Sequence, residues 1–483
     1  MKNPFHVVSP FKRSDVYFVL TVSGLLGFFF GSQAECNWQN AVEGAQVIAG
    51  LVKYPPANPF FMYQVKAWTF LHQFLALLLR MGFSERTLSI FTSGIMGAFS
   101  LQAFSLLTLC FSRNKWTAIL APLFISYSSI YAFGTVYAVS LMGSMTTYGI
   151  IGMAWIMMTF ALLSLGEAES GGWMLGMAPA IHPTLGLFSW VIAGIAGWFE
   201  RREIKPHLKK WVLFFLLGCF CSLISWIFYE WRVHEWLPKG MSIDKATFVN
   251  FVKMWDGHRV PVPFNSEDTY FNLAVFLISW SWLVFFQKDL FTESRFILRV
   301  LMVSAILGMS AMVFTWMPIE KMPALLVSMM PGRILSIAIF GFGPLLIGLA
   351  DRYRGNQAAD LFLVFFLLIL LCVVRGMHLD FYVLLSLLMV FAVLFLILKW
   401  FAWIKIEESN RGNFFLRAVI FLVFGMSAAA HFFHAAHMAG ERHSAMKDWT
   451  NDSFFATTAK DQKSLLLIGP DIGSIQLLPV VLW

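Results

Sequence analysis

Residues 16–38 read VYFVLTVSGLLGFFFGSQAECNW. The run from Val16 to Gly31 contains no charged residue and predicts a helix inside a lipid bilayer. Gln33 and Glu35 follow it at once, at the boundary between lipid and water. A carboxylate at such a boundary is costly unless it faces a wet cavity or has a partner. Glu35 is therefore a candidate functional residue.

The rest of the chain repeats this apolar pattern. Of 483 residues, 58% are hydrophobic and 13% charged, and the mean hydropathy is +0.70, which excludes a soluble globule. Since helices satisfy their own backbone hydrogen bonds in lipid, we expect an all-α polytopic membrane protein. The predicted spans number about thirteen, and lie near residues 16–31, 88–111, 116–132, 147–165, 172–184, 185–198, 211–229, 270–287, 297–315, 333–350, 360–375, 380–400 and 415–435.

The orientation follows from the distribution of Lys and Arg. With the N-terminus inside, the short inner loops have roughly three times the basic density of the long outer loops, as the positive-inside rule requires. The most basic inner loop is 199–210, which we expect to contact anionic lipid. The formal net charge of +8 therefore reflects topology, and no nucleic-acid partner is predicted. Thirteen spans place the C-terminus outside.

Polar residues concentrate in the outer segments. The membrane-embedded region, 1–435, contains outer loops at 32–87, 230–269 and 316–333, and a short outer tail, 436–483, follows it. In the first loop the Pro-rich stretch 53–59 breaks the chain. We expect an amphipathic helix from Phe60 to Leu79 to lie in the membrane interface, because counting it as a span would invert every later loop.

Two carboxylates of the first outer loop are candidates for chemistry. Glu35 could act as a general base or a metal ligand at the membrane surface, or it could be a solvated or helix-capping side chain. Glu43 is a candidate substrate-binding residue, and the alternative is a solvated face of the next helix. Lys66, on the interfacial helix, is a further substrate-binding candidate.

Cationic and histidine side chains of the outer face form a second group. His182 stands before Pro183, where two half-length helices should meet in an outer turn, and could bind a phosphate or a sugar hydroxyl or merely cap the backbone. His258 and Arg259 suit an anionic headgroup, although Arg259 could instead pair with Asp256. Arg333 begins a span from the outer face, where a snorkelling role is the alternative.

No metal site is predicted. His431, His434 and His437 recur every three residues, so the first and third diverge by about 120° around a helix, which is poor geometry for one ion. Gly-rich phosphate loops, nucleophile elbows and His-Glu-x-x-His patterns are absent from the sequence.

The layout resembles the GT-C class of membrane glycosyltransferases, most closely an uncharacterised bacterial branch. An acidic residue directly after the first span, a helix after the Pro-Pro-x-Asn-Pro of 55–59, basic inner turns and a short outer tail carry the resemblance. Locally it rests on segments 35–66, 180–186, 257–263, 331–335 and 464–482. It implies a polyprenyl-phosphate sugar donor, transfer on the extracytoplasmic face of the bacterial inner membrane, and Glu35 in the catalytic acidic position.

One departure from this class concerns the metal. Many members place a second acidic residue in the next outer loop, whereas residues 135–148 contain no carboxylate, which argues against a metal-dependent mechanism. A divalent cation is the one cofactor that the resemblance would allow.

These observations favour an inverting sugar transfer to a lipid or glycan acceptor. Glu35 would deprotonate the acceptor hydroxyl, and His258, Arg259 and Arg333 would stabilise the departing lipid phosphate. A transporter or flippase of lipid-linked sugars is the first alternative, although such proteins commonly contain paired repeats, which this sequence lacks. An O-antigen-type polymerase or ligase is the second.

Overall fold

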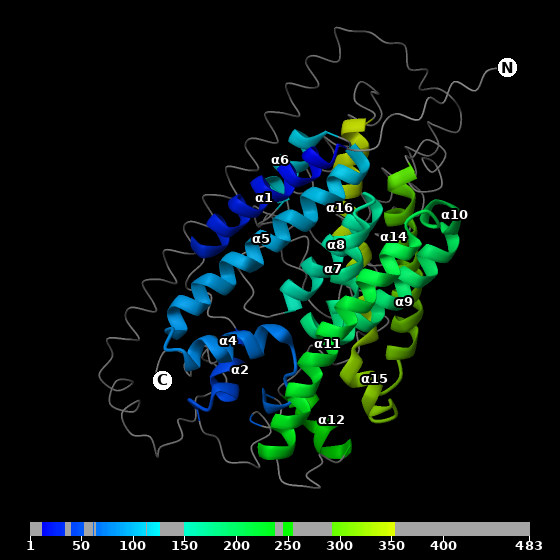
Figure 1. Cartoon of the computed structure of the whole chain (residues 1–483). Helices are drawn as coiled ribbons and strands as arrows, with labels where there is room; N and C mark the ends of the chain where they lie inside the picture. The colour runs from blue at the N-terminus through cyan, green and yellow to red at the C-terminus, as the bar shows by residue number, and fades with distance from the viewer. Residues whose placement is uncertain are drawn as a thin grey trace, which may run out of the picture.

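Figure 1 shows the computed structural model of the whole chain. The residues that it describes are 12–33, 40–52, 61, 64–112, 114–125, 149–236, 245–254 and 292–352. Throughout these ranges the regular secondary structure is helical, as the sequence predicts. The predicted spans at 270–287, 360–375, 380–400 and 415–435 lie outside the described residues.

Five described segments are long and apolar enough to cross a membrane, which makes this a multi-pass membrane protein by helix length and hydropathy. Four of them correspond to α1 (Arg13–Gln33), α5 (Glu85–Ser112), α11 (Leu208–Trp236) and α14 (Thr292–Thr315). The fifth runs from Ala324 to Leu345, through α15 (Ala324–Met329) into α16 (Ile334–Arg352).

The centre of the bundle is α5, whose side chains are largely buried. It packs on α1, on α7 (Gly149–Ser164) and on α16. Large aromatic side chains fill this centre: Phe104 of α5 meets Phe340 of α16 edge to face, with ring centroids 6.2 Å apart. The helix α6 (Lys115–Ile125) covers one end of it.

Small residues explain why α1 and α5 pack so closely. A Cβ added at Gly97 would lie 2.1 Å from the carbonyl oxygen of Gly27, and one at Gly31 would lie 2.3 Å from the carbonyl oxygen of Ser93. Lipid offers no hydrophobic driving force between helices, so close backbone approach through small residues supplies the packing energy. The glycines of the first predicted span are thus a helix-contact surface.

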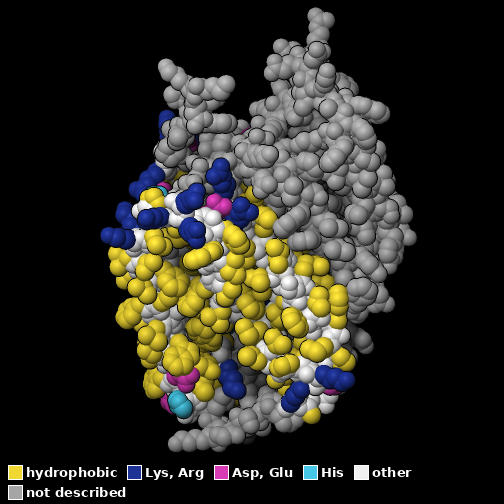
Figure 2. Space-filling view, turned by 90° about the vertical axis from the view of Figure 1, so that its right-hand side faces the viewer, with side chains coloured by type: hydrophobic (Ala, Val, Ile, Leu, Met, Phe, Trp, Pro, Cys, Tyr) yellow, Lys and Arg dark blue, Asp and Glu magenta, His cyan; other side chains and the backbone are white. Residues whose placement is uncertain are grey.

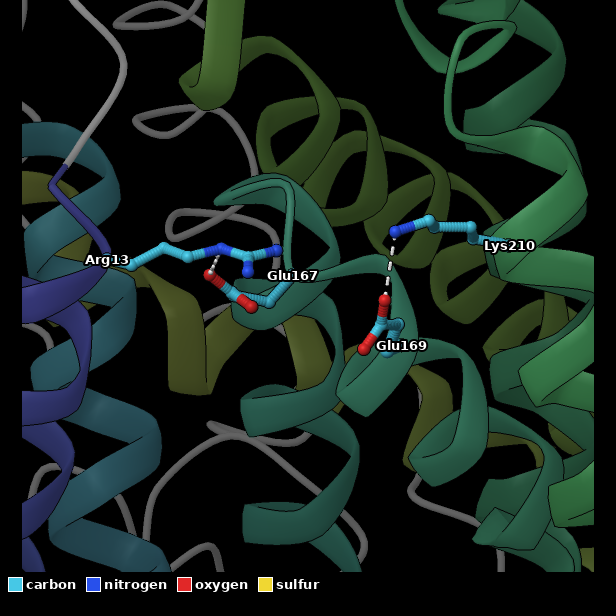
Figure 3. Close-up of polar contacts among 4 residues, drawn as sticks. All are labelled: Arg13, Glu167, Glu169 and Lys210. Atoms are coloured by element: carbon cyan, nitrogen blue, oxygen red, sulfur yellow. Dashed lines mark hydrogen bonds and ion pairs between the residues drawn. The ribbon is translucent and has the colours of Figure 1, made fainter.

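One end of the bundle, here the basic end, gathers charged side chains. Figure 2 shows Lys and Arg crowded at this end above a broad hydrophobic surface. Figure 3 shows Arg13 of α1 reaching Glu167 at 3.3 Å, and Lys210 of α11 reaching Glu169 at 3.0 Å. Similar pairs join Lys115 to Asp15 and Arg299 to Glu200, both at 2.9 Å. These contacts tie the helix ends together where the sequence predicts the inner face.

Two helices form a hairpin that starts and ends at the basic end. They are α8 (Ala168–Ile181) and α9 (Pro183–Phe199), followed by the short α10 (Arg201–Ile204). At 1.5 Å per residue they reach only about 21 and 25 Å, less than the roughly 30 Å of a bilayer core. The prediction of two half-length helices meeting at His182 is confirmed.

The opposite end, here the far end, contains α2 (Asn40–Ala49), α4 (Phe70–Arg80), α12 (Lys245–Met254) and α15 (Figure 1). The helix α4 packs its buried residues on α2 and exposes Phe70, Phe74 and Leu77, as suits a helix lying in the membrane interface.

The single interfacial helix predicted over residues 60–79 is interrupted at residues 66–69. Three carbonyl groups of the break are bound by donors outside a helical ladder: Arg232 binds those of Val65 and Ala67, and Ser225 and Gln73 bind that of Trp68. Thr69 then caps α4 by accepting from the backbone N–H of His72. Because these donors come largely from α11, the local sequence could not reveal the break.

Candidate functional site

His182 occupies the tip of the α8–α9 hairpin. Its backbone is extended, with φ −143° and ψ 106°, and Pro183 starts the next helix. The Nδ1 atom accepts a hydrogen bond from the backbone N–H of Leu185 at 3.4 Å, so the ring caps α9. The side chain is only 2% exposed, and Gly152 of α7 packs so tightly on it that an added Cβ would lie 2.5 Å from the Cβ of His182. The capping alternative is therefore present in the structure.

Arg333 lies at a second break in the helices. Met330 takes a left-handed conformation, with φ 46°, and ends α15. Pro331–Arg333 form a single 3₁₀ turn (η4) before α16 begins. A left-handed non-glycine residue is strained and marks a position to inspect for function. The Arg333 side chain is 8% exposed, so it does not extend along the surface as a snorkelling residue would.

The two breaks bring His182 and Arg333 together from positions 151 residues apart in sequence. The Nη1 atom of Arg333 lies 3.5 Å from Nε2 of His182, and both side chains are buried. A neutral imidazole has one acceptor and one donor nitrogen. Arg333 has only N–H donors, so Nε2 of His182 is the acceptor in this contact, and the roles of the two ring nitrogens depend on the tautomer. The guanidinium group, oriented in this way by His182, suits an acceptor such as a phosphate oxygen.

Helix geometry places this pair inside the bundle. Gly308 of α14 touches the backbone of Leu335, and α14 continues about 10 Å beyond that contact before it ends at Thr315. Gly176 of α8 and Gly218 of α11 likewise meet at backbone distance. From that crossing toward the far end, His182 is about 9 Å away along α8, whereas α11 continues for about 27 Å until it ends at Trp236. By comparison with the ends of both α14 and α11, the pair therefore lies roughly 10 Å or more inside the far end of the bundle.

An arginine at such a depth is costly unless it is solvated or partnered, and by default it indicates a functional site. Two helices, α9 and α16, begin directly after His182 and Arg333, so their N-termini lie next to the pair. Helix N-termini present backbone N–H groups and favour negative charge. The local electrostatics thus favour an anion.

Glu43 belongs to a different place. It lies on α2, which packs against α4 rather than on the helices that carry His182 and Arg333. Its side chain is 7% exposed, and burial raises the pKa of this carboxyl to about 8. The alternative of a solvated face is therefore wrong for this residue, and its role in substrate binding stays a prediction. Nearby, burial and the charge of Arg232 lower the pKa of His72 to about 4.

Of the other predicted site residues, one is described by the structure and three are not. Lys66 is exposed in the turn before α4. Glu35, His258 and Arg259 lie outside the described residues, as do the histidines near the last predicted span. Within the described ranges, no group of three or more potential metal ligands occurs.

Sequence reasoning missed Arg232. It sits near the end of α11 and binds the carbonyl groups of Val65 and Ala67 at 2.6 to 3.1 Å. The only sequence signal was a lone arginine at the outer end of a long apolar run. An arginine at such a position is equally typical of an ordinary interfacial anchor.

Comparison with known protein families, characterised proteins and solved structures finds no match to this chain.

Proposed function

We propose that this protein is a membrane glycosyltransferase that moves a sugar from a polyprenyl-phosphate carrier to a lipid or glycan acceptor. The observation that carries the proposal is the buried pair of His182 and Arg333, whose side-chain nitrogen atoms lie 3.5 Å apart. Arg offers a planar fork that matches phosphate, and the adjacent imidazole orients that fork. In this proposal, the phosphate of a lipid-linked sugar approaches the pair from within the membrane.

The proposed architecture is GT-C-like, with about thirteen spans in a bacterial inner membrane. The basic end, with Arg201, Lys205 and Lys210, would face the cytoplasm by the positive-inside rule. The far end, with α4 in the interface, would face outward. The His182–Arg333 pair would then open toward the extracytoplasmic side, where the carrier lipid presents its sugar.

The proposed chemistry is a single displacement with inversion. The acceptor hydroxyl oxygen forms a bond to the anomeric carbon while the bond from that carbon to the phosphate oxygen breaks. The lipid phosphate leaves with the electron pair, and Glu35 takes the hydroxyl proton. Arg333, oriented by His182, stabilises the charge that develops on the phosphate, with His258 and Arg259 as further candidates. No step requires a metal ion.

A second candidate function is transport of a lipid-linked sugar or a similar amphiphile. Transporters commonly build their binding sites from discontinuous helices whose N-termini point at an anionic group. The hairpin tip at His182 and the break at Met330–Arg333 are two such interruptions, and they meet. The same pair could therefore bind a lipid phosphate that is moved rather than reacted.

Sugar transfer in proteoliposomes separates the two functions. Purified protein is offered a panel of polyprenyl-phosphate sugars, and transfer is compared between wild type and Glu35→Gln. The proposal expects transfer by wild type, its loss in Glu35→Gln, and donor binding retained in both. If no donor is turned over while labelled lipid crosses the bilayer equally well in both proteins, the transporter replaces the glycosyltransferase.

A further inference from the structure

Arg232 of α11 is buried, with 7% of its surface exposed, and holds the turn before α4. Its Nε and Nη2 atoms bind the carbonyl oxygen of Val65 at 3.1 and 3.0 Å, and Nη2 also binds that of Ala67 at 2.6 Å. These bonds leave Nη1 without a hydrogen bond to any described residue. The guanidinium thus has polar neighbours on one side and a remaining donor on the other.

No carboxylate among the described residues neutralises this charge. Two glutamates share the end of α11 with it, but Glu230 faces His234 at 3.6 Å, and neither Glu230 nor Glu235 forms an ion pair with Arg232. Besides the phenol group of Tyr229, the side chain that acts on its charge is another cation, Arg80. A buried charge without an opposite partner is costly, and an anionic ligand would relieve that cost.

The surroundings of Arg232 suit a lipid headgroup. Trp231, the next residue toward the basic end, is 67% exposed, and interfacial tryptophans mark the headgroup level of membranes. Lys66 is exposed between the two residues whose carbonyls Arg232 binds. Measured from the crossing at Gly176 and Gly218, Arg232 lies about 12 Å nearer the far end than His182.

We propose that Arg232 and Lys66 form a second anion site, which binds the phosphate group of a lipid at the rim of the far end. It is separate from the His182–Arg333 pair and does not depend on the glycosyltransferase proposal. Arg232 supplies a fixed donor and a buried charge, and Lys66 adds a mobile charge from the interface. A phosphate monoester headgroup fits this site better than a zwitterionic one, because two positive charges meet it.

Titration of the full-length protein with dioleoyl phosphatidate in detergent, followed by native mass spectrometry, tests this site. We expect Arg232→Gln, which keeps an amide donor for the carbonyl groups, to weaken phosphatidate binding about tenfold. Lys66→Gln should weaken it about threefold, because that charge is exposed. Lys321→Gln, which removes an exposed lysine elsewhere at the far end, should leave it unchanged.

Two results would overturn the proposal. If Arg232→Gln lowers the melting temperature while both Arg232→Gln and Lys66→Gln bind phosphatidate like wild type, Arg232 only stabilises the turn before α4. If Arg333→Gln removes the binding, the phosphate sits at the deeper pair. Competition with inorganic phosphate identifies the source of the anion: displacement at equal concentration indicates free phosphate, and its absence indicates a lipid headgroup.

Discussion

At the scale of single residues, the buried carboxyl group of Glu43 has the clearest thermodynamic consequence. Burial raises its pKa from 4.5 to about 8, so the folded protein binds this proton more tightly than the unfolded chain does. Its contribution to stability is complete below pH 4.5 and is lost as the pH rises toward 8. His72 changes stability with pH in the opposite direction. Its pKa falls from 6.5 to about 4 on folding, so its contribution to stability is lost as the pH falls.

Between pH 6.5 and 8 the effect of Glu43 dominates, since His72 is neutral in the folded protein and loses at most half a proton in the unfolded chain there. We expect wild type to lose stability across this window, by about 1–2 kcal/mol. Glu43→Gln should show a flatter dependence of melting temperature on pH. The exposed Glu235→Gln serves as the matched control and should follow wild type. Identical slopes in wild type and Glu43→Gln would show that Glu43 is not buried as a neutral acid.

Each member of the His182–Arg333 pair was readable from the sequence, but the pairing was not. His182 stands out because a proline follows it, and Arg333 because it begins an apolar run. Their meeting depends on two helix breaks that bring distant segments to the same depth, and tertiary packing of this kind leaves no local signal. The burial of Glu43 could not be predicted for the same reason, since it comes from the packing of α2 against α4.

At the scale of helices, close glycine contacts fix the bundle, and Gly97 tests this most simply. A Cβ at Gly97 would lie 2.1 Å from the carbonyl oxygen of Gly27, so Gly97→Ala must push α1 and α5 apart. We expect a loss of about 1–3 kcal/mol, measured as a lower melting temperature in detergent. Gly194→Ala is the control, because nothing lies within 4 Å of its added Cβ; it should be neutral or stabilising by up to about 1 kcal/mol. Equal effects of the two would contradict the contact.

Helix existence was predictable where apolar runs are long and uninterrupted. The predicted spans 88–111, 211–229 and 297–315 correspond to α5, α11 and α14, with boundaries extended by a few residues. The break at residues 66–69 was missed because its carbonyl groups are bound mainly from α11. Where the hydrogen-bond donor comes from a remote helix, the hydropathy along the chain does not indicate the break.

At the scale of the whole molecule, the separation of charge between the two ends predicts the orientation in the membrane. In a cysteine-free background, Lys66→Cys should react with a membrane-impermeant maleimide added outside intact spheroplasts, because Lys66 is exposed at the far end. Lys205→Cys, exposed at the basic end, should react only after permeabilisation. The reverse labelling pattern would invert the topology and place the His182–Arg333 pair toward the cytoplasm.

The class of molecule was readable from composition, since a mean hydropathy of +0.70 leaves few alternatives to a membrane bundle. The position of the candidate site could be predicted only in part. Histidine and arginine at the outer face were expected, yet their recess of roughly 10 Å follows from the lengths and crossings of α8, α11 and α14. Such depths depend on three-dimensional packing rather than on local pattern.

The most direct test of the account is equilibrium binding of polyprenyl-phosphate sugars to the protein in nanodiscs. Wild type and Glu35→Gln should bind a donor from the panel equally well, whereas Arg333→Gln should bind it at least about tenfold more weakly. His182→Asn, which retains a side-chain cap for α9, should also bind more weakly without loss of folding. Donor binding that is unchanged in both Arg333→Gln and His182→Asn would contradict a phosphate site at this pair.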